Sequence, residues 1–498
     1  MTALLVIDVG TTGLRAAMVG DDGRIHQLDH RPFPPTTPFP GLVEFDAAAM
    51  SDLVLDAARS VVAASGQAAD AVGITNQRAS TIVWDRRTGV PVGPGLGWQD
   101  LRTVNECITA GAEHGLTLAP NQSATKIAWL LDSIDAGTAE RGGDGGARER
   151  DLCFGTVDSW LVWVLSRGER HITDPTNASV TGLMRADGSG WDETVCDVLR
   201  IPMSMLPEIV DTAGGTVADA ALLDGTPPIT ALAGDQQASL VGQGCVRVGM
   251  TKITFGTGGM LDVCSGHDAP ERSCRSEHGT FPIVAWSLKG RRTWAREAIM
   301  LAAGSNVDWL VEDLGLFHDS ADSAEMATRC ETSEGTMYVP ALLGLGTPYW
   351  DYGARGTLVG MTRGTTAAHV TRAVLEGVAH RGADLVEAAQ GDLDARIPSL
   401  RIDGGMSRNE VFVKALATAA QLPVEVSPVV EATTLGAGFL AGLGAGAWSG
   451  MDEIASTWNP SSVVEPGPES DASKDRERWR SAVERSAGWI PELSSLDF

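Results

Sequence analysis

Two short segments rich in glycine and threonine, one in each half of the chain, constrain the fold more than any other feature. Residues 8–13 (DVGTTG) directly follow the apolar run at 3–7, and residues 255–259 (FGTGG) follow Ile253. Each segment is expected to join the end of one strand to the start of the next. Small residues there let backbone N–H groups close on an anion, and threonine hydroxyls add donors. The pair predicts two related domains that hold one polyphosphate from both sides.

Length and charge limit the classes of protein that remain. A chain of 498 residues is too long for one core, so we expect two domains, residues 1–243 and 244–498. The net charge of −26 argues against a nucleic-acid partner, because binding to phosphate backbones needs clustered Lys and Arg. The N-terminal segment does not resemble a signal peptide, and apolar runs are too short for a membrane span. The seven cysteines form no C-x-x-C pair, which favours a reduced, cytoplasmic setting.

Hydrophobic periodicity predicts the elements that carry these turns. Strands are expected at 14–19, 71–75, 81–84 and 400–402, and a strand–turn–strand at 250–263 echoes residues 3–19. Helical spacing covers 46–64, 123–134, 365–389, 409–420, 434–448 and 476–489. Residues 135–150 are expected to form a flexible surface loop, and the polar stretch 458–475 is expected to be loosely ordered.

Asp8 is the acidic residue of the first phosphate turn. Neither G-x-x-x-x-G-K-[ST] nor G-x-G-x-x-G occurs, so these turns are of another type. An acid beside a polyphosphate makes sense when a divalent cation lies between them, and Mg²⁺ accepts one carboxylate together with waters and phosphate oxygens. Asp8 is therefore predicted to be a metal-side residue. The alternative is an aspartate that only caps its turn.

Asp235 is the second acid of interest. It follows the apolar segment 228–233 and opens a predicted helix, whose positive end favours a carboxylate. Phosphoryl transfer to an alcohol needs a carboxylate near the attacking hydroxyl. Asp8 and Asp235 together would supply a metal-side acid and a base. The alternative for Asp235 is a helix cap.

Residues 401–409 (RIDGGMSRN) form the third element. A strand is expected to end at the two glycines and a helix to begin shortly afterwards. Glycines there allow a flat ring to approach the backbone, so a ribose or adenine site is predicted. The alternative is an ordinary strand–helix turn.

These elements occur together and in the order found in one family. The segments IDVGTTGLRA (7–16), AGDQQASLVGQ (233–243), FGTGG (255–259), DGGMSRN (403–409) and EATTLGAGFLAGL (431–443) carry the resemblance. The chain resembles the FGGY carbohydrate kinases, and among them the glycerol kinases most closely. The resemblance implies an α/β fold with two ribonuclease-H-like domains of the actin/hexokinase superfamily and an active site in the cleft between them. It also implies ATP, Mg²⁺ and a small polyol or sugar as substrate.

The resemblance implies roles position by position. The nucleotide-binding positions would be Thr11, Thr12, Gly13, Arg15, Thr257, Gly258, Gly304, Asp308, Gly405 and Asn409. Asp235 would be the catalytic base, and Asp8 would hold Mg²⁺ through water. The acceptor would meet Arg78, Ala79, Trp98, Asn121, Gln236 and Met260. Homo-oligomers, dimers or tetramers, are expected from the family.

Three departures from the glycerol kinase pattern fall on the acceptor side. Those enzymes carry Glu, Tyr and Phe where this chain has Ala79, Asn121 and Met260, and they carry Gln at the nucleotide position of Asp308. A buried hydroxyl that loses its acceptor costs about 1–3 kcal/mol. Two hypotheses follow: glycerol or a close analogue is the acceptor, or a larger polyol or ketose of four or five carbons replaces it.

A different class of protein also has to be weighed, namely a non-catalytic, actin-like nucleotide-binding regulator. Such a protein would be expected to lose the base or the metal-side acid. Both Asp8 and Asp235 are present, which favours an enzyme. A further alternative is that ATP hydrolysis without an acceptor dominates, although closure around an alcohol normally suppresses attack by water.

Overall fold

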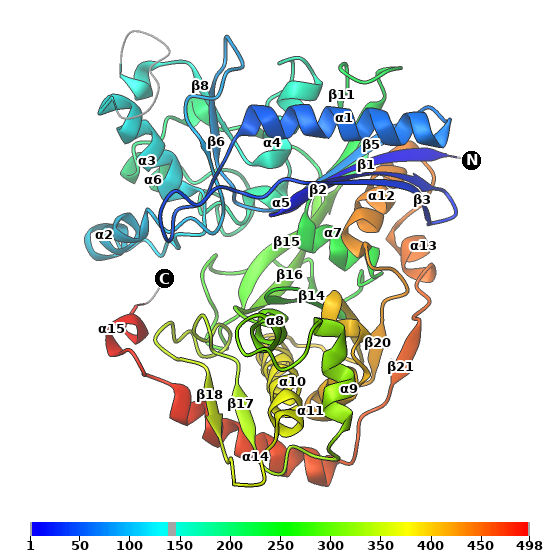
Figure 1. Ribbon diagram of the computed structural model, residues 1–498. Coiled ribbons are helices and arrows are strands. Elements are labelled where there is room, and N and C mark those ends of the chain that lie inside the picture. Colours follow the sequence, from blue (N-terminus) through cyan, green and yellow to red (C-terminus); the bar gives the residue numbers. More distant parts are fainter. Residues whose placement is uncertain (1, 138–145, 497–498) are drawn as a thin grey trace.

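A continuous mixed sheet runs through the molecule from end to end (Figure 1). The computed structural model describes residues 2–137 and 146–496. Within these residues, thirteen strands form the sheet in the order β21 (Ser462–Val464), β20 (Val424–Val426), β19 (Leu400–Asp403), β13 (Thr251–Phe255), β14 (Gly259–Gly266), β16 (Arg291–Met300), β15 (Phe281–Leu288), β11 (Ala213–Asp219), β12 (Pro228–Gly234), β5 (Ala71–Asn76), β1 (Ala3–Val9), β2 (Gly13–Gly20) and β3 (Ile25–Pro32).

Helices cover both faces of this sheet, and short strands pair beside it. The helices are α1 (Ala47–Ser65), α2 (Val104–His114), α3 (Ala124–Asp135), α4 (Val157–Leu165), α5 (Pro175–Ala178), α6 (Glu193–Val198), α7 (Asp235–Gly242), α8 (Ser305–Glu312), α9 (Ser323–Thr328), α10 (Ala367–Gly391), α11 (Glu410–Ala420), α12 (Ala432–Ala445), α13 (Met451–Ser456), α14 (Glu469–Ser486) and α15 (Pro491–Ser494). The short strands are β4 (Glu44–Phe45), β6 (Ile82–Asp85), β7 (Gly95–Leu96), β8 (Leu152–Gly155), β9 (Ile172–Thr173), β10 (Glu208–Ile209), β17 (Met337–Val339) and β18 (Thr357–Val359). None of the described helices combines the length and the apolar content needed to cross a bilayer.

The two halves of the sheet repeat one topology. In the first half, β1, β2 and β3 are antiparallel neighbours, and β5 runs parallel to β1. In the second half, β13, β14 and β16 are antiparallel neighbours, and β19 runs parallel to β13. The predicted echo between residues 3–19 and 250–263 is therefore confirmed, and each glycine- and threonine-rich turn is the hairpin at the end of the first strand.

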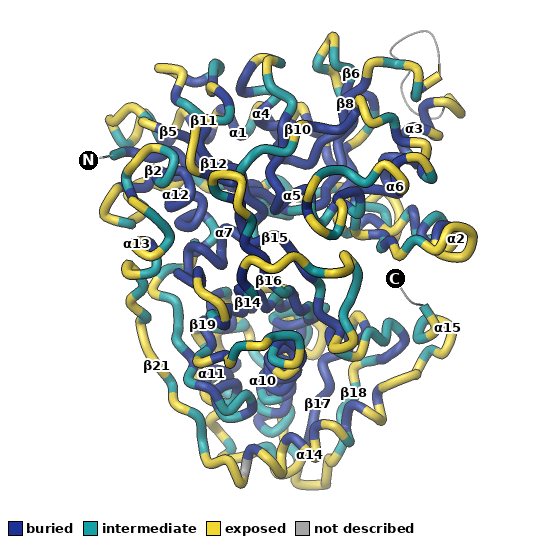
Figure 2. The backbone as a smooth tube through the Cα atoms, turned by 180° about the vertical axis from the view of Figure 1, so that it is seen from behind, coloured by how far each residue is buried: buried dark blue, intermediate teal, exposed yellow. Residues whose placement is uncertain are grey.

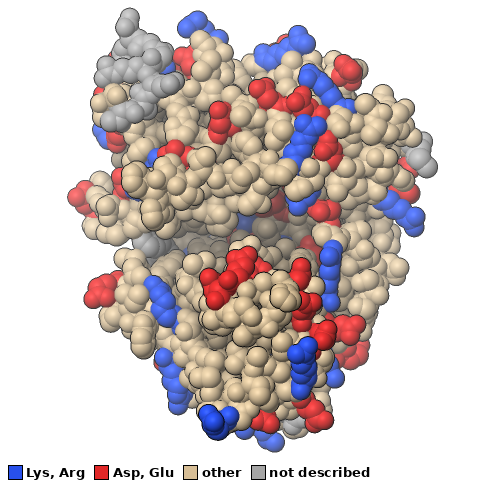
Figure 3. Space-filling model, viewed as in Figure 1, with Lys and Arg blue, Asp and Glu red and all other residues tan. Residues whose placement is uncertain are grey.

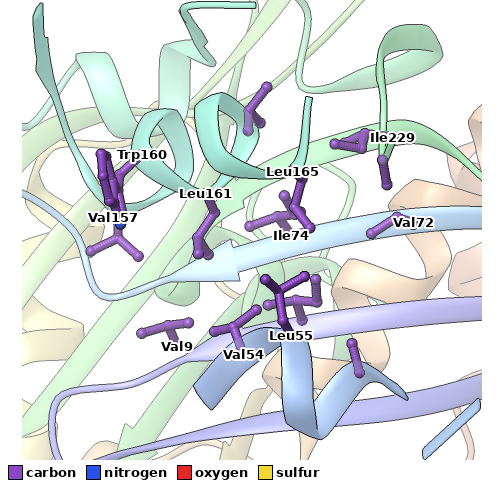
Figure 4. Packing of buried hydrophobic residues seen from close by; sticks show 14 of the residues in the cluster. Val9, Val54, Leu55, Val72, Ile74, Val157, Trp160, Leu161, Leu165 and Ile229 are labelled. Atoms are coloured by element: carbon purple, nitrogen blue, oxygen red, sulfur yellow. The ribbon is translucent and has the colours of Figure 1, made fainter. Parts of the chain in front are cut away.

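The core of the first half forms because β1 and β5 are mostly apolar and every residue of the two strands is buried. Val9, Val72 and Ile74 face α1 and α4 across this layer (Figure 4). The Asp46 side chain accepts a hydrogen bond from the Ala49 N–H and so begins α1. The strands that lead to the site are fixed by this packing.

Helix α12 crosses from the second half of the chain to the first. It packs beside α7 against β1, β5 and β12, and the backbone of the central strands is buried there (Figure 2). The two helices touch through glycines: a Cβ placed on Gly436 would lie 1.8 Å from the Ala238 carbonyl oxygen. This contact brings segments remote in sequence together beside the site.

One prediction about order is wrong. Residues 458–475 contain β21 and the start of α14, rather than a loosely ordered stretch. β21 pairs antiparallel with β20, and the Trp458 indole N–H donates to Glu425 over 2.6 Å. Pairing at the sheet edge therefore orders a segment whose composition is polar. The predicted loop at 135–150 falls mostly on residues outside the described part, although 147–149 form a 3₁₀ turn.

Candidate active site

The two predicted acids, Asp8 and Asp235, lie where three parallel strands end. Val9 of β1 lies beside Asn76 of β5, and Asn76 lies beside Gly234 of β12. Asp8 stands at the end of β1, and Asp235 directly follows β12. In parallel sheets, ligands bind outside the carboxyl ends of the strands. A recess in the molecular surface lies between the two halves (Figure 3).

Asp8 is buried in this region and makes few contacts. The Thr434 hydroxyl donates to Asp8 Oδ2 over 2.8 Å, and Arg15 Nη1 lies 3.8 Å from the same oxygen. Burial raises the pKa of Asp8 to about 6, and the nearby Arg15 opposes this shift. Asp235 contributes to the raised pKa as well, so the two carboxylates are close enough to sense each other.

Asp235 occupies the first position of α7. Its Oδ1 accepts from the Gln236 backbone N–H over 2.8 Å, and Arg78 Nε lies 3.4 Å from the same oxygen. Burial raises the pKa of Asp235, and Arg78 is the main opposing influence. A carboxylate whose pKa moves toward neutrality is better suited to accept a proton from an alcohol.

Arg78 and Gln236 are held from the second half of the chain. Arg78 Nη2 lies 2.6 Å from Glu297 Oε2 on β16. The Lys252 ammonium, on β13, donates to Gln236 Oε1 over 2.6 Å. Arg78 Nη1 is buried and has no hydrogen-bond partner among the described residues. One donor of Arg78 is therefore left for a ligand.

The other four predicted acceptor-side residues are more dispersed. The Trp98 indole N–H donates to the Thr11 hydroxyl over 3.1 Å, which joins the acceptor side to the first phosphate turn. Ala79 is buried with a positive φ of 58°, and Met260 on β14 is half-buried. Asn121 is exposed at the turn before α3. The structure connects Trp98 to the site and leaves Asn121 at the surface.

The two predicted phosphate turns are closed hairpins. In the first, the Gly10 N–H donates to the Gly13 carbonyl over 2.9 Å, with Thr12 between them. In the second, the Gly304 N–H donates to the Gly256 carbonyl over 2.8 Å and so brings α8 against the turn. A Cβ placed on Gly258 would lie 2.9 Å from the Met300 carbonyl oxygen, which explains glycine there.

Arg15, from the first hairpin, turns toward the second half of the chain. Its Nε lies 3.0 Å from Glu431 Oε2, at the start of α12. A guanidinium held by one carboxylate keeps donors for a phosphate. Arg15 therefore stands between Asp8 and the N-terminus of α12.

A cavity of about 370 Å³ gathers five of the predicted nucleotide residues. The Asp308 carboxylate accepts from the Ser320 hydroxyl over 2.8 Å, and Asn409 Nδ2 donates to Ser323 over 3.0 Å. Asn409 Oδ1 also caps α11. The predicted residues that line the cavity are Thr257, Gly304, Asp308, Gly405 and Asn409.

Comparison with known sequences decides the family. The N-terminal domain of the FGGY family of carbohydrate kinases matches residues 3–242, and its C-terminal domain matches residues 251–445. The chain belongs to the FGGY family of carbohydrate kinases. It is therefore an ATP-dependent kinase, and the predicted two-domain α/β fold related to actin and hexokinase is confirmed.

Individual relatives place this carbohydrate kinase close to the glycerol kinases. It is 41% identical to a glycerol kinase of Aromatoleum aromaticum, with 98% of this chain and 100% of that protein covered. It is also 41% identical to one of Deinococcus radiodurans, with 98% of each covered. The structure of Plasmodium falciparum glycerol kinase with ADP has a TM-score of 0.87 at 29% identity, with 98% of each chain covered. A xylulose kinase of Lactobacillus acidophilus, at 19% identity and a TM-score of 0.83, covers 97% of this chain and 98% of its own and shares the fold.

Sequence reasoning missed three residues of this kinase that contact Gln236, Arg78 and Asp8. Lys252 contacts Gln236, Glu297 contacts Arg78, and Thr434 contacts Asp8. A charged side chain inside an apolar strand, such as Lys252 just before the second phosphate turn, is a signal that could have been used. Thr434 lies in a helix of small residues and gives no such signal.

Proposed function

We propose that this kinase transfers the γ-phosphoryl group of ATP to a terminal hydroxyl of glycerol or a close analogue. One observation carries the proposal: Asp235, Arg78 and Gln236 converge at the N-terminus of α7, within electrostatic reach of Asp8. The identity of 41% to glycerol kinases over nearly the whole chain supports the choice of acceptor.

In this proposal, Asp235 accepts the proton of the attacking hydroxyl. Burial raises the pKa of Asp235 and so makes the carboxylate a stronger base, while its contact with Arg78 favours the charged form. Arg78 Nη1 and the amide of Gln236 would donate to acceptor oxygens. Phosphoryl transfer depends mainly on such positioning and on stabilisation of charge.

The nucleotide would lie along the 370 Å³ cavity, with its phosphates directed to the two hairpin turns. Gly405 and Asn409 would contact the adenosine, and Thr257 and Gly258 the phosphates. Thr11, Thr12, Gly13 and Arg15 would receive the terminal phosphate from the opposite side. Asp308, where glycerol kinases carry Gln, would meet the nucleotide through an acceptor fixed by Ser320.

The residues present fit a magnesium ion. Asp8 is a buried carboxylate with a raised pKa, and a cation would stabilise its charged form. Mg²⁺ keeps several waters and binds through one carboxylate and phosphate oxygens, so no cluster of acids is needed. When bound, the ion would neutralise charge on the phosphates. Asp8, held by Thr434, would anchor it through water.

A second candidate acceptor is a larger polyol or ketose of four or five carbons. Ala79 brings no carboxylate to the loop after β5, and Asn121 lies exposed at the turn before α3. Met260 on β14 is half-buried. With Ala79 where glycerol kinases carry Glu, a hydroxyl of glycerol would lack one charged acceptor, which favours a different acceptor.

The test is ADP release across a panel of acceptors: glycerol, dihydroxyacetone, erythritol, xylitol, both arabitols, ribulose and xylulose. The proposal predicts that glycerol has the highest kcat/KM. A longer acceptor that leads by more than about tenfold, or 1.4 kcal/mol, would favour the second candidate. Turnover no higher than that of Asp235→Asn with every acceptor would refute both.

We further propose a functional division of the chain, a cellular location and a state of assembly. The chain would divide functionally into residues 1–243, with the acceptor side, and 244–498, with the adenosine side. The enzyme would work in the cytoplasm. It would assemble as a homo-oligomer, a dimer or tetramer, which sedimentation velocity can test.

A further inference from the structure

A row of charged side chains crosses the second half of the sheet beneath the acceptor side. Lys252 of β13 pairs in register with Asp262 of β14, and Asp262 pairs with Glu297 of β16. Residues directly opposite each other on neighbouring strands point to the same face. The three side chains therefore form one line across three strands. Its central residue, Asp262, lies two residues after Met260 on β14.

Each end of this line contacts an acceptor-side residue of the first half. At one end, the Lys252 ammonium donates to Gln236 Oε1 over 2.6 Å. At the other end, Glu297 Oε2 lies 2.6 Å from Arg78 Nη2. An ammonium can only donate, so the Gln236 amide is held with its oxygen toward Lys252. The Gln236 NH₂ is the group left for an acceptor oxygen.

The line is buried, and together with Arg78 it brings two basic and two acidic side chains into contact. Lys252 and Asp262 have fully buried side chains, with the ammonium 2.8 Å from Asp262 Oδ2. Glu297 is buried as well, and burial raises its pKa to about 7 while Arg78 opposes the shift. Asp262 thus places a carboxylate directly beside the Lys252 side chain inside the sheet. Well-packed apolar residues often stabilise a fold at least as well as a buried ion pair does, so stability alone does not explain this charged pair beside the site.

We propose that Lys252 and Glu297 are positioning residues that fix the acceptor-side groups of Gln236 and Arg78, with Asp262 as the counter-charge of Lys252. The inference rests on the proposed function, because it concerns how the same site recognises its acceptor. In this proposal, side chains in the second half of the sheet contribute to acceptor recognition by holding Gln236 and Arg78, without touching the acceptor themselves.

The test replaces the charge pair without leaving a lone charge buried. Lys252→Met combined with Asp262→Leu removes both charges and replaces them with apolar side chains of similar length, so the sheet is expected to remain folded. Glu297→Gln is the second variant, because it keeps the size of the side chain while it removes the charge that holds Arg78. A matched control is Arg401→Met combined with Glu425→Leu. That ion pair joins β19 to β20 and contacts neither Arg78 nor Gln236.

We expect the Lys252→Met/Asp262→Leu variant to raise the acceptor KM about tenfold or more, with the ATP KM and the circular dichroism spectrum unchanged. Glu297→Gln should raise the acceptor KM in the same way, whereas the control should not. An acceptor KM within about twofold of wild type in both test variants would overturn the inference. Wild-type enzyme that phosphorylates no acceptor would instead refute the proposed function.

Discussion

The close contact between α7 and α12 predicts that one substitution will lower both stability and activity. A Cβ placed on Gly436 would lie 1.8 Å from the Ala238 carbonyl oxygen, and one on Gly242 would lie 1.9 Å from the Ala432 carbonyl oxygen. Real Cβ atoms essentially never approach another atom closer than 3.0 Å. Gly436→Ala must therefore separate the two helices by about 1.2 Å, the difference between these distances.

The size of the effect follows from what would have to move. Overpacking costs about 1–3 kcal/mol, and here the opposing atom is backbone rather than a flexible side chain, so we expect the upper end. A loss of about 3 kcal/mol corresponds to a fall in Tm of about 6–12 °C. Because α7 carries Asp235 and α12 carries the Thr434 that holds Asp8, kcat should also fall, by about 10²-fold for a displacement near 1 Å.

Differential scanning calorimetry and a coupled ADP assay on the same preparations would measure both effects. Gly215→Ala is the matched control, because a Cβ at that position meets nothing within 4 Å. If Gly436→Ala shared the Tm and kcat of Gly215→Ala, the close approach of the two helices would be contradicted.

Three further predictions concern single contacts. Lys126→Met removes the buried amino group that donates to the Trp98 carbonyl over 3.2 Å. This variant should raise the acceptor KM about tenfold and leave the ATP KM unchanged. Equal changes in both KM values would contradict a role for Lys126 on the acceptor side. Thr434→Val removes the hydroxyl that holds Asp8 and should lower kcat about tenfold, and Thr434→Ser should restore it; a silent Thr434→Val would contradict this role. Burial lowers the pKa of His171 to about 4, below its ordinary 6.5, so its contribution to stability is present above pH 6.5 and lost as pH falls toward 4. The free energy of unfolding, measured with urea, should therefore fall less steeply between pH 6.5 and pH 4 for His171→Gln than for the wild type. Identical slopes of the unfolding free energy against pH would refute the assignment.

Features with a local physical cause could be predicted from the sequence. The buried strands β1 and β13 and the glycine- and threonine-rich hairpins after them stand out, because apolar runs and small residues are contiguous in the chain. The helix expected at 46–64 is α1, Ala47–Ser65, since its apolar spacing and the Asp46 cap both lie within the segment. Such features fixed the duplicated topology.

Contacts between remote segments could not be predicted in the same way. Thr434 and Asp8 are separated by 426 residues, and no periodicity connects them. Lys252 and Gln236 lie on different elements that meet only once the sheet has formed. The error at 458–475 has the same origin, because a polar segment became a strand through pairing with β20, which its own composition does not encode.

The measurement that tests the central claim most directly is phosphorus NMR of ATP, Mg²⁺ and glycerol, with wild-type enzyme and with Asp235→Asn. The account predicts that wild type forms a phosphomonoester of glycerol in step with ADP. Asp235→Asn should retain its fold and form the ester about 10²–10⁴-fold more slowly. Inorganic phosphate as the main product of the wild type, or an Asp235→Asn rate within about tenfold of wild type, would contradict the account.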